Sequence, residues 1–177
     1  MIFNKTALND AYIIDLNKLQ DERGFFARTF CVKEFEKYGI EFSIAQANIS
    51  YSRLKQTLRG MHYQKKPYGE AKLVCCTKGG IYDVIVDLRS VSSTYGEWIG
   101  TELTEKNYRM LYVPEGFAHG FITLEDETEV FYQMSEYYTP GAAQGIRWDD
   151  AAFDIEWPLE PKVISEKDKN WANYDLL

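Results

Sequence analysis

The stretch from residue 72 to residue 124 decides the fold class of this chain: KLVCCTKGGIYDVIVDLRSVSSTYGEWIGTELTEKNYRMLYVPEGFAHGFITL. It consists of short runs of β-branched and aromatic residues, which Gly, Pro, Asn or charged residues separate. Such runs with regular turn signals and no intervening helices indicate a β-sandwich or barrel. The predicted strands are Lys72–Cys76, Ile81–Leu88, Trp98–Leu103, Met110–Val113, Ala118–Leu124 and, just beyond the quoted stretch, Val130–Tyr137.

Within Ile81–Leu88, Asp83 and Asp87 interrupt the apolar residues, which is typical of a strand that faces a cavity on one side. Outside the strand-rich region, two stretches carry helical signals. Val32–Tyr38 is amphipathic around a phenylalanine and is followed by Gly39, a common stop signal. A helical turn is also expected around Glu166–Lys169. The length of 177 residues, without repeats or linkers, predicts one domain over residues 1–177.

Composition and charge exclude several classes of protein. The net charge of −7 argues against nucleic-acid binding, although a few local Arg and Lys can still bind a small anion. We find no apolar run of about 18 residues and no signal-peptide pattern at the start, so we expect no membrane association. Cys31, Cys75 and Cys76 show neither a disulfide framework nor zinc spacing, which favours a reducing cytoplasm.

The chain has only two histidines, and we expect both at the ends of strand-like segments, beside glycine-containing turns. His62 lies in LRGMHYQ (Leu58–Gln64) and His119 in VPEGFAHGF (Val113–Phe121). A structural histidine is the ordinary reading of such a residue. The polar and charged neighbours of His62, with Arg59 before it and Lys72 after it, favour a functional role instead.

A metal site is a further alternative, because His62, Gln64, Glu70 and His119 approach the spacing of the cupin metal ligands. Gln64 stands where the second histidine of that set belongs, and an amide oxygen is a poor ligand for metals that imidazole suits. Arg59 and Lys72 would also repel a cation. The sequence therefore disfavours a metal here.

Seven motifs occur together in one order and cover nearly the whole chain. In that order they resemble the dTDP-4-dehydrorhamnose 3,5-epimerase family of nucleotide-sugar epimerases. The resemblance implies an all-β fold, a cupin-type jelly roll with a few short helices, and a homodimer with strand exchange. It also implies no metal and no cofactor, and a place in dTDP-rhamnose biosynthesis. The motifs are DERGFFARTF (Asp21–Phe30), LRGMHYQ, AKLV (Ala71–Val74), YDVIVDLR (Tyr82–Arg89), VPEGFAHGF, YYTP (Tyr137–Pro140) and ISEKD (Ile164–Asp168).

The family reaction epimerises carbons that flank a ketone, and the resemblance implies four catalytic residues. His62 is expected to remove the α-proton, since the ordinary pKa of histidine lies near working pH. Asp168 is expected to pair with His62, and Lys72 to stabilise the enolate. Tyr132 is expected to return a proton on the opposite face.

The resemblance further implies residues that hold the nucleotide-sugar substrate. Arg59 and His119 resemble contacts to the diphosphate and the sugar, and Tyr138 a second tyrosine of the pocket. Arg23 resembles an arginine that enters the neighbouring subunit's site, with Phe26 beside it. The remaining matches are Gln46, Asn48 and Lys167.

Three positions depart from the family pattern. The chain has Arg28 and Ala143 where the family commonly has Glu, and Glu70 where it commonly has Gln. Because a guanidinium only donates hydrogen bonds, Arg28 could relax a preference for thymine and admit a CDP-linked sugar. Two further classes remain open from the residues: a metal-dependent cupin enzyme and a sugar-binding cupin without activity. An epimerase of C3, C5 or both explains the motifs best.

Overall fold

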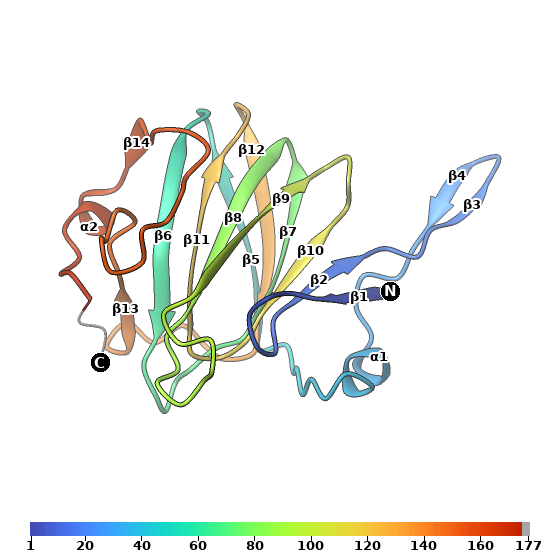
Figure 1. Ribbon diagram of the computed structural model, residues 1–177. Coiled ribbons are helices and arrows are strands. Elements are labelled where there is room, and N and C mark those ends of the chain that lie inside the picture. Colours follow the sequence, from blue (N-terminus) through green and yellow to red (C-terminus); the bar gives the residue numbers. More distant parts are fainter. Residues whose placement is uncertain (175–177) are drawn as a thin grey trace.

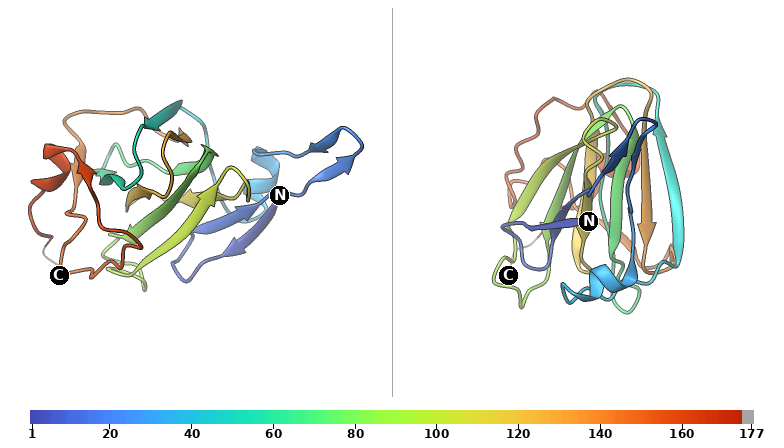
Figure 2. Two further views of the ribbon diagram at one scale, coloured as in Figure 1. Left: turned by 90° about the horizontal axis from the view of Figure 1, so that it is seen from above. Right: turned by 90° about the vertical axis from the view of Figure 1, so that its right-hand side faces the viewer.

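The computed structural model describes residues 1–174 and consists of two sheets packed face to face (Figure 1; Figure 2, right). The first sheet has the strand order β1 (Ile2–Lys5), β2 (Tyr12–Asp15), β10 (Met110–Val113), β7 (Lys72–Lys78), β12 (Thr128–Met134) and β5 (Gln46–Ser52). The second has the order β13 (Ala143–Gly145), β6 (Thr57–Gln64), β11 (Phe117–Thr123), β8 (Gly80–Asp87) and β9 (Trp98–Thr104), and β14 (Val163–Ile164) also pairs with β6.

The path of the chain is that of a jelly roll. Between β5 and β12 the chain changes sheet at nearly every step, so that β5, β7, β10 and β12 lie in the first sheet and the strands between them in the second. Within these two sheets neighbouring strands pair antiparallel, except that β14 runs parallel to β6. The predicted all-β, cupin-type jelly roll is confirmed.

The inter-sheet core explains the strand pattern in the sequence. Ile81 and Ile85 of β8 pack between the sheets against Val74 and Val130. Val84 and Val86 of the same strand belong to a second cluster, which Ile146 and Phe153 of the C-terminal segment help to form. β8 is therefore buried on both faces, and this is why its sequence is almost continuously apolar rather than strictly alternating.

Helix α1 (Val32–Glu36) covers the outer face of the first sheet. Its Phe35 is fully buried and packs in a cluster with residues of β2, β7 and β10. The predicted helix over Val32–Tyr38 is thus two residues too long, while Gly39 ends the turn with a φ of 73°. The expected turn near the C-terminus is confirmed as α2 (Glu166–Lys169).

A hairpin of β3 (Leu19–Asp21) and β4 (Gly24–Phe26) projects away from the sandwich (Figure 1; Figure 2, left). Leu19 and Phe26 on this hairpin are 63% and 68% exposed, which is unusual for large apolar side chains. None of the helices within residues 1–174 has the length and apolar composition needed to cross a bilayer.

Candidate active site

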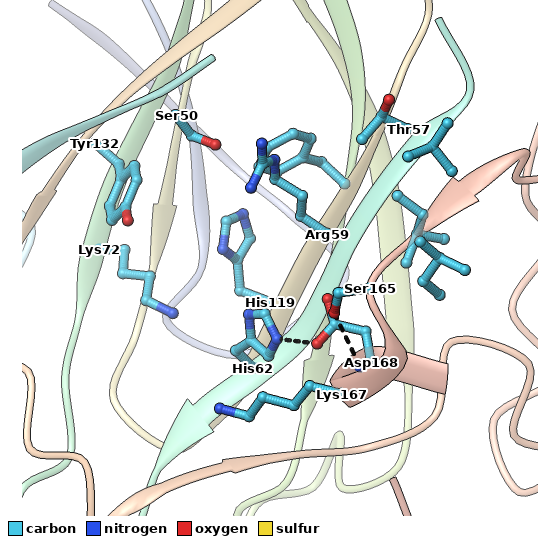
Figure 3. A pocket seen from close by; sticks show the side chains of 14 residues that line it. Ser50, Thr57, Arg59, His62, Lys72, His119, Tyr132, Ser165, Lys167 and Asp168 are labelled. Atoms are coloured by element: carbon cyan, nitrogen blue, oxygen red, sulfur yellow. Dashed lines mark hydrogen bonds and ion pairs between the residues drawn. The ribbon is translucent and has the colours of Figure 1, made fainter. Parts of the chain in front are cut away.

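A main cavity of about 510 Å³ lies between the two sheets and the C-terminal segment (Figure 3). β5, β7 and β12 of the first sheet form one wall, and β6 and β11 of the second sheet form the other. A side compartment of about 360 Å³ adjoins it and shares four of its lining residues: His62, Lys72, Tyr132 and Lys167.

A β-bulge in β6 turns Arg59 and His62 toward the same cavity. Strict alternation would place residues three positions apart on opposite faces of the sheet. His119 of β11 lies opposite His62 and Phe121 opposite Arg59, so β6 contains one extra residue between these pairs. Gly60 permits this close approach, because a Cβ there would lie 2.5 Å from the Cα of Gly120 and its φ is 128°.

His62 forms a tight pair with a buried carboxylate. Its Nε2 lies 2.6 Å from Oδ1 of Asp168, and the other carboxylate oxygen accepts a hydrogen bond from the Gly60 N–H at 3.3 Å. Burial raises the pKa of the Asp168 carboxyl, but its hydrogen bond to His62, the attraction between the two groups and the Gly60 N–H bring that pKa below its ordinary value. The carboxylate favours a proton on Nε2 of His62, which leaves the lone pair on Nδ1 available as a base.

The C-terminal segment brings Asp168 to His62 across 106 residues of sequence. β14 first pairs with the start of β6, with Val163 opposite Thr57. Ser165 then caps α2, because its hydroxyl accepts a hydrogen bond from the Asp168 N–H at 3.1 Å. With a relative exposure of 4%, Asp168 is not the solvated helix-start residue that its local sequence alone would indicate.

The second histidine has its own carboxylate. Nε2 of His119 lies 2.6 Å from Oδ1 of Asp83 on β8, and both residues are buried. His119 lies directly across from His62 in the pairing of β6 with β11. Both histidines therefore lie within strands rather than at strand ends, and Figure 3 shows both rings at the main cavity.

Lys72 and Tyr132 line the wall of the main cavity opposite the two histidines (Figure 3). Lys72 is the first residue of β7, and Tyr132 lies on β12 beside Asn48 of β5. Burial raises the pKa of the Tyr132 phenol, Glu70 raises it further, and Arg59 lowers it. The phenol is thus a proton donor across the pH range in which an imidazole acts as a base.

Arg59 reaches from the second sheet to the edge of the first. Its Nε donates to the Ser52 hydroxyl at 3.1 Å and its Nη2 to the Tyr51 carbonyl at 2.9 Å. In the side compartment, the Gln46 amide oxygen accepts a hydrogen bond from the Tyr138 N–H at 2.7 Å. Gln46, Asn48 and Lys167 thus give this compartment hydrogen-bond donors and acceptors beside His62.

No three side chains among the His, Cys, Asp and Glu residues of positions 1–174 converge closely enough to hold a metal ion. Each of the four residues that the sequence suggested as possible metal ligands contacts another group of the protein instead. The histidines bind carboxylates, Gln64 donates to the carbonyl of Tyr68, and Glu70 pairs with Lys72.

Comparison with known families adds a match over residues 5–175 to the family described as dTDP-4-dehydrorhamnose 3,5-epimerase. The chain belongs to this family. A dTDP-4-dehydrorhamnose 3,5-epimerase from Methanothermobacter thermautotrophicus is 48% identical over 173 residues, which cover 96% of this chain and 92% of that protein.

Solved structures of family members agree with the fold. The epimerase of Bacillus anthracis with TDP and PPi bound superposes with a TM-score of 0.93 at 40% identity, covering 98% of this chain and 99% of that one. The Legionella pneumophila epimerase in complex with dTDP-4-keto-L-rhamnose gives a TM-score of 0.87 at 38% identity, with 94% and 89% covered.

The structure brings most of the residues expected from the family resemblance to the two cavities. The main cavity is lined by Arg59, His62, Lys72, His119, Tyr132, Lys167 and Asp168, and the side compartment also by Gln46, Asn48 and Tyr138. The other three expected residues lie elsewhere. Arg23 and Phe26 lie on the projecting hairpin, and Arg28 pairs with Glu34 of α1 at 2.8 Å.

Sequence reasoning missed three residues of the site. Ser50 lines the main cavity and lies on the same face of β5 as Gln46 and Asn48. The alternation of side chains along a strand could therefore have identified it from the sequence. Ser165 precedes Asp168 by three residues, the spacing of a capping pair. Asp83 was recognised as a polar interruption of its strand, but its pairing with His119 depends on the register of β8 and β11.

Proposed function

We propose that this chain inverts C3 and C5 of a dTDP-linked 4-keto-6-deoxyhexose, converting dTDP-4-dehydro-6-deoxy-D-glucose to dTDP-4-dehydro-L-rhamnose. One observation carries the proposal beyond family membership. The imidazole of His62, which pairs with Asp168 of α2, lies on one sheet and the Tyr132 phenol lies on the other, and both face a single cavity. Epimerisation removes a proton from one side of a sugar ring and returns a proton from the other side, so it requires a base and an acid on opposite walls of the site.

In the proposed reaction, Nδ1 of His62 removes the proton next to the ketone, and Asp168 stabilises the imidazolium that forms. The Lys72 ammonium lies at the opposite wall, where it stabilises the negative charge that develops on the ketone oxygen. Tyr132 then donates its phenolic proton to the other face of the carbon. Exchange with solvent then removes the proton from His62 and returns one to Tyr132, so that repetition at the second carbon inverts both centres, and no redox or metal chemistry is needed.

Charge and polarity of the cavity fit an anionic substrate. Arg59 and Lys167 present donors to it, and we assign them, with His119, to the diphosphate and the sugar. Gln46, Asn48 and Tyr138 line the side compartment and complete the proposed substrate-binding set.

The proposed function is tested by incubating the protein with dTDP-4-dehydro-6-deoxy-D-glucose in deuterium oxide containing EDTA. NMR of the product should show solvent deuterium at C3 and C5. One relative, from Streptomyces niveus, is named a 3-epimerase, so the positions of uptake also distinguish single from double epimerisation. The absence of uptake at both carbons would overturn the proposal.

We further propose a homodimer in which the β3–β4 hairpin of each subunit completes the partner's site. The side chain of Arg23 is 85% exposed and contacts Asp21 of its own hairpin, away from the cavity. The outer face of β5 also exposes Ile49 and Tyr51, at 63% and 48%. Exposed apolar groups of this size support an interface between subunits.

Mixing two inactive variants should restore activity if Arg23 acts in the partner's site. Arg23→Ala removes the hairpin arginine, and His62→Ala removes the base. In a mixed dimer one site carries both changes and the other carries neither, so random pairing restores about a quarter of the wild-type sites. The measurement is turnover after co-refolding differently tagged variants. A mixture no more active than its components would show that each subunit uses its own Arg23.

Substitution of Arg28 tests whether this residue, which follows the β3–β4 hairpin, recognises the nucleotide base of the substrate. If its guanidinium relaxes the preference for thymine, Arg28→Glu should shift the ratio of kcat/KM for CDP- against dTDP-linked substrate toward dTDP by about tenfold or more, since a hydrogen bond to a charged group is worth roughly 1.5–3 kcal/mol. Arg28→Gln is the matched control, because a new Glu would also face Glu34. An unchanged ratio in both variants would show that Arg28 does not read the base.

The three cysteines are free thiols, and burial raises the pKa of Cys75 to about 11 and that of Cys76 to about 12. A raised pKa keeps these two thiols protonated and unreactive. We propose a cytoplasmic location because all three cysteines are free.

A further inference from the structure

A buried ion pair lies at the wall of the proposed site. Oε1 of Glu70 lies 2.9 Å from Nζ of Lys72, and the two side chains are only 6% and 8% exposed. Glu70 stands two residues ahead of Lys72, just before β7 begins. A lysine side chain has four rotatable bonds, so a fixed carboxylate at this distance determines where its ammonium lies.

The second oxygen of Glu70 has no hydrogen-bond partner among residues 1–174, and it is closed to solvent. A buried carboxylate with one unpaired oxygen is costly, and replacing such an ion pair by apolar groups often stabilises a protein. The pair is therefore poorly explained by stability alone. Its negative charge is compensated by Lys72 and faces the side compartment, which Tyr132 also lines.

The Glu70 carboxylate also acts on Tyr132. After burial, it is the strongest influence that raises the pKa of the phenol. The other charged groups that line the cavity around this phenol come from four elements: Lys72 of β7, Arg59 and His62 of β6, His119 of β11, and Lys167 and Asp168 of α2. Tyr63 and Tyr138 are the neighbouring phenols. Among these groups Arg59 lowers the pKa of Tyr132, in opposition to Glu70.

We propose that Glu70 is a positioning residue, which fixes the Lys72 ammonium at the wall of the compartment that Tyr132 also lines. The proposal rests on the proposed function for the roles of Lys72 and Tyr132. One buried carboxylate then serves both steps of the reaction. It holds the cation that stabilises the enolate, and it keeps the acid protonated until the enolate accepts its proton.

The test compares the wild type with Glu70→Gln, which keeps the shape of the side chain and removes its charge. We expect kcat to fall about tenfold while KM changes less than twofold, since displacement of a catalytic group costs rate more than binding. In a Lys72→Met background the same change should lower kcat by clearly less than tenfold, because the effect on the ammonium is already lost and only the effect on Tyr132 remains.

A second measurement needs no substrate, so its failure can be distinguished from a failure of the proposed function. The protein is labelled with fluorotyrosine, whose phenol ionises at lower pH than that of tyrosine, and Tyr132 is assigned by the resonance missing in Tyr132→Phe. Fluorine NMR should show that Tyr132 ionises at lower pH in Glu70→Gln than in the wild type. Glu129→Gln is the matched control, because it removes a charge from the same strand outside the cavity and should leave the titration unchanged.

A purely structural role makes a different prediction. Glu70→Gln would then change the thermal midpoint and leave both the Tyr132 titration and the kcat of the folded protein as in the wild type. That result, or an equal shift in Glu129→Gln, would overturn the proposal.

Discussion

Replacing His62 with alanine should lower kcat/KM for the 4-keto sugar nucleotide by about 10²–10⁴-fold, the usual contribution of a general base. His62 is the imidazole that Asp168 orients at the main cavity, whereas His119 is buried against Asp83. The His62 side chain is 42% exposed, so its truncation opens no core cavity and the protein should stay folded. Deuterium uptake at C3 and C5, followed by NMR, measures the loss.

Two controls make this result specific. His62→Ala should still unfold in one cooperative thermal transition, although its midpoint should fall because the buried Asp168 carboxylate loses its partner. Asp168→Asn, which keeps the shape of the partner but removes its charge, should reduce kcat less than loss of the base itself. Uptake at the wild-type rate in His62→Ala would show that another group removes the proton.

Tyr132→Phe should separate the two halves of the reaction. Proton removal requires His62 and Lys72, whereas return of a proton to the opposite face requires the phenol. We therefore expect product formation to fall by about 10²–10⁴-fold, while loss of the substrate α-proton slows much less. Phenylalanine preserves the packing of this side chain against the inter-sheet core, so the fold should be unaffected.

Tyr137→Phe is the matched control, because Tyr137 lines neither cavity and is 66% exposed. Its product formation should stay within a few-fold of the wild type. If Tyr132→Phe slows proton loss and product formation equally, the acid is a different group, and Tyr138 is the first candidate.

Local patterns predicted much of the sandwich. Five of the expected strands coincide with β7 to β11 within two residues at each end, because each is a short apolar run between turn residues. The last expected strand, Val130–Tyr137, is displaced by two to three residues from β12. The sequence predicts His62 at the end of a strand-like segment, whereas His62 lies inside β6. A bulge in that strand aims Arg59 and His62 at one cavity, and no local pattern indicates it.

Residue chemistry and family resemblance identified ten of the side chains that line the two cavities. The resemblance was necessary for Asp168 and Tyr132, because neither has a distinctive local pattern. Arg23, Phe26 and Arg28 lie outside the cavities, and their expected roles require a second subunit.

The strand-forming segments, the turns between them and the residue types available for proton transfer can be predicted from local sequence, because they depend on neighbours a few positions apart. Which of these residues meet depends on the tertiary structure. Asp168 reaches His62 across 106 residues, Asp83 faces His119 from a neighbouring strand, and Tyr132 stands on the opposite sheet. Such contacts follow from strand order and register, which many distant packing interactions determine together.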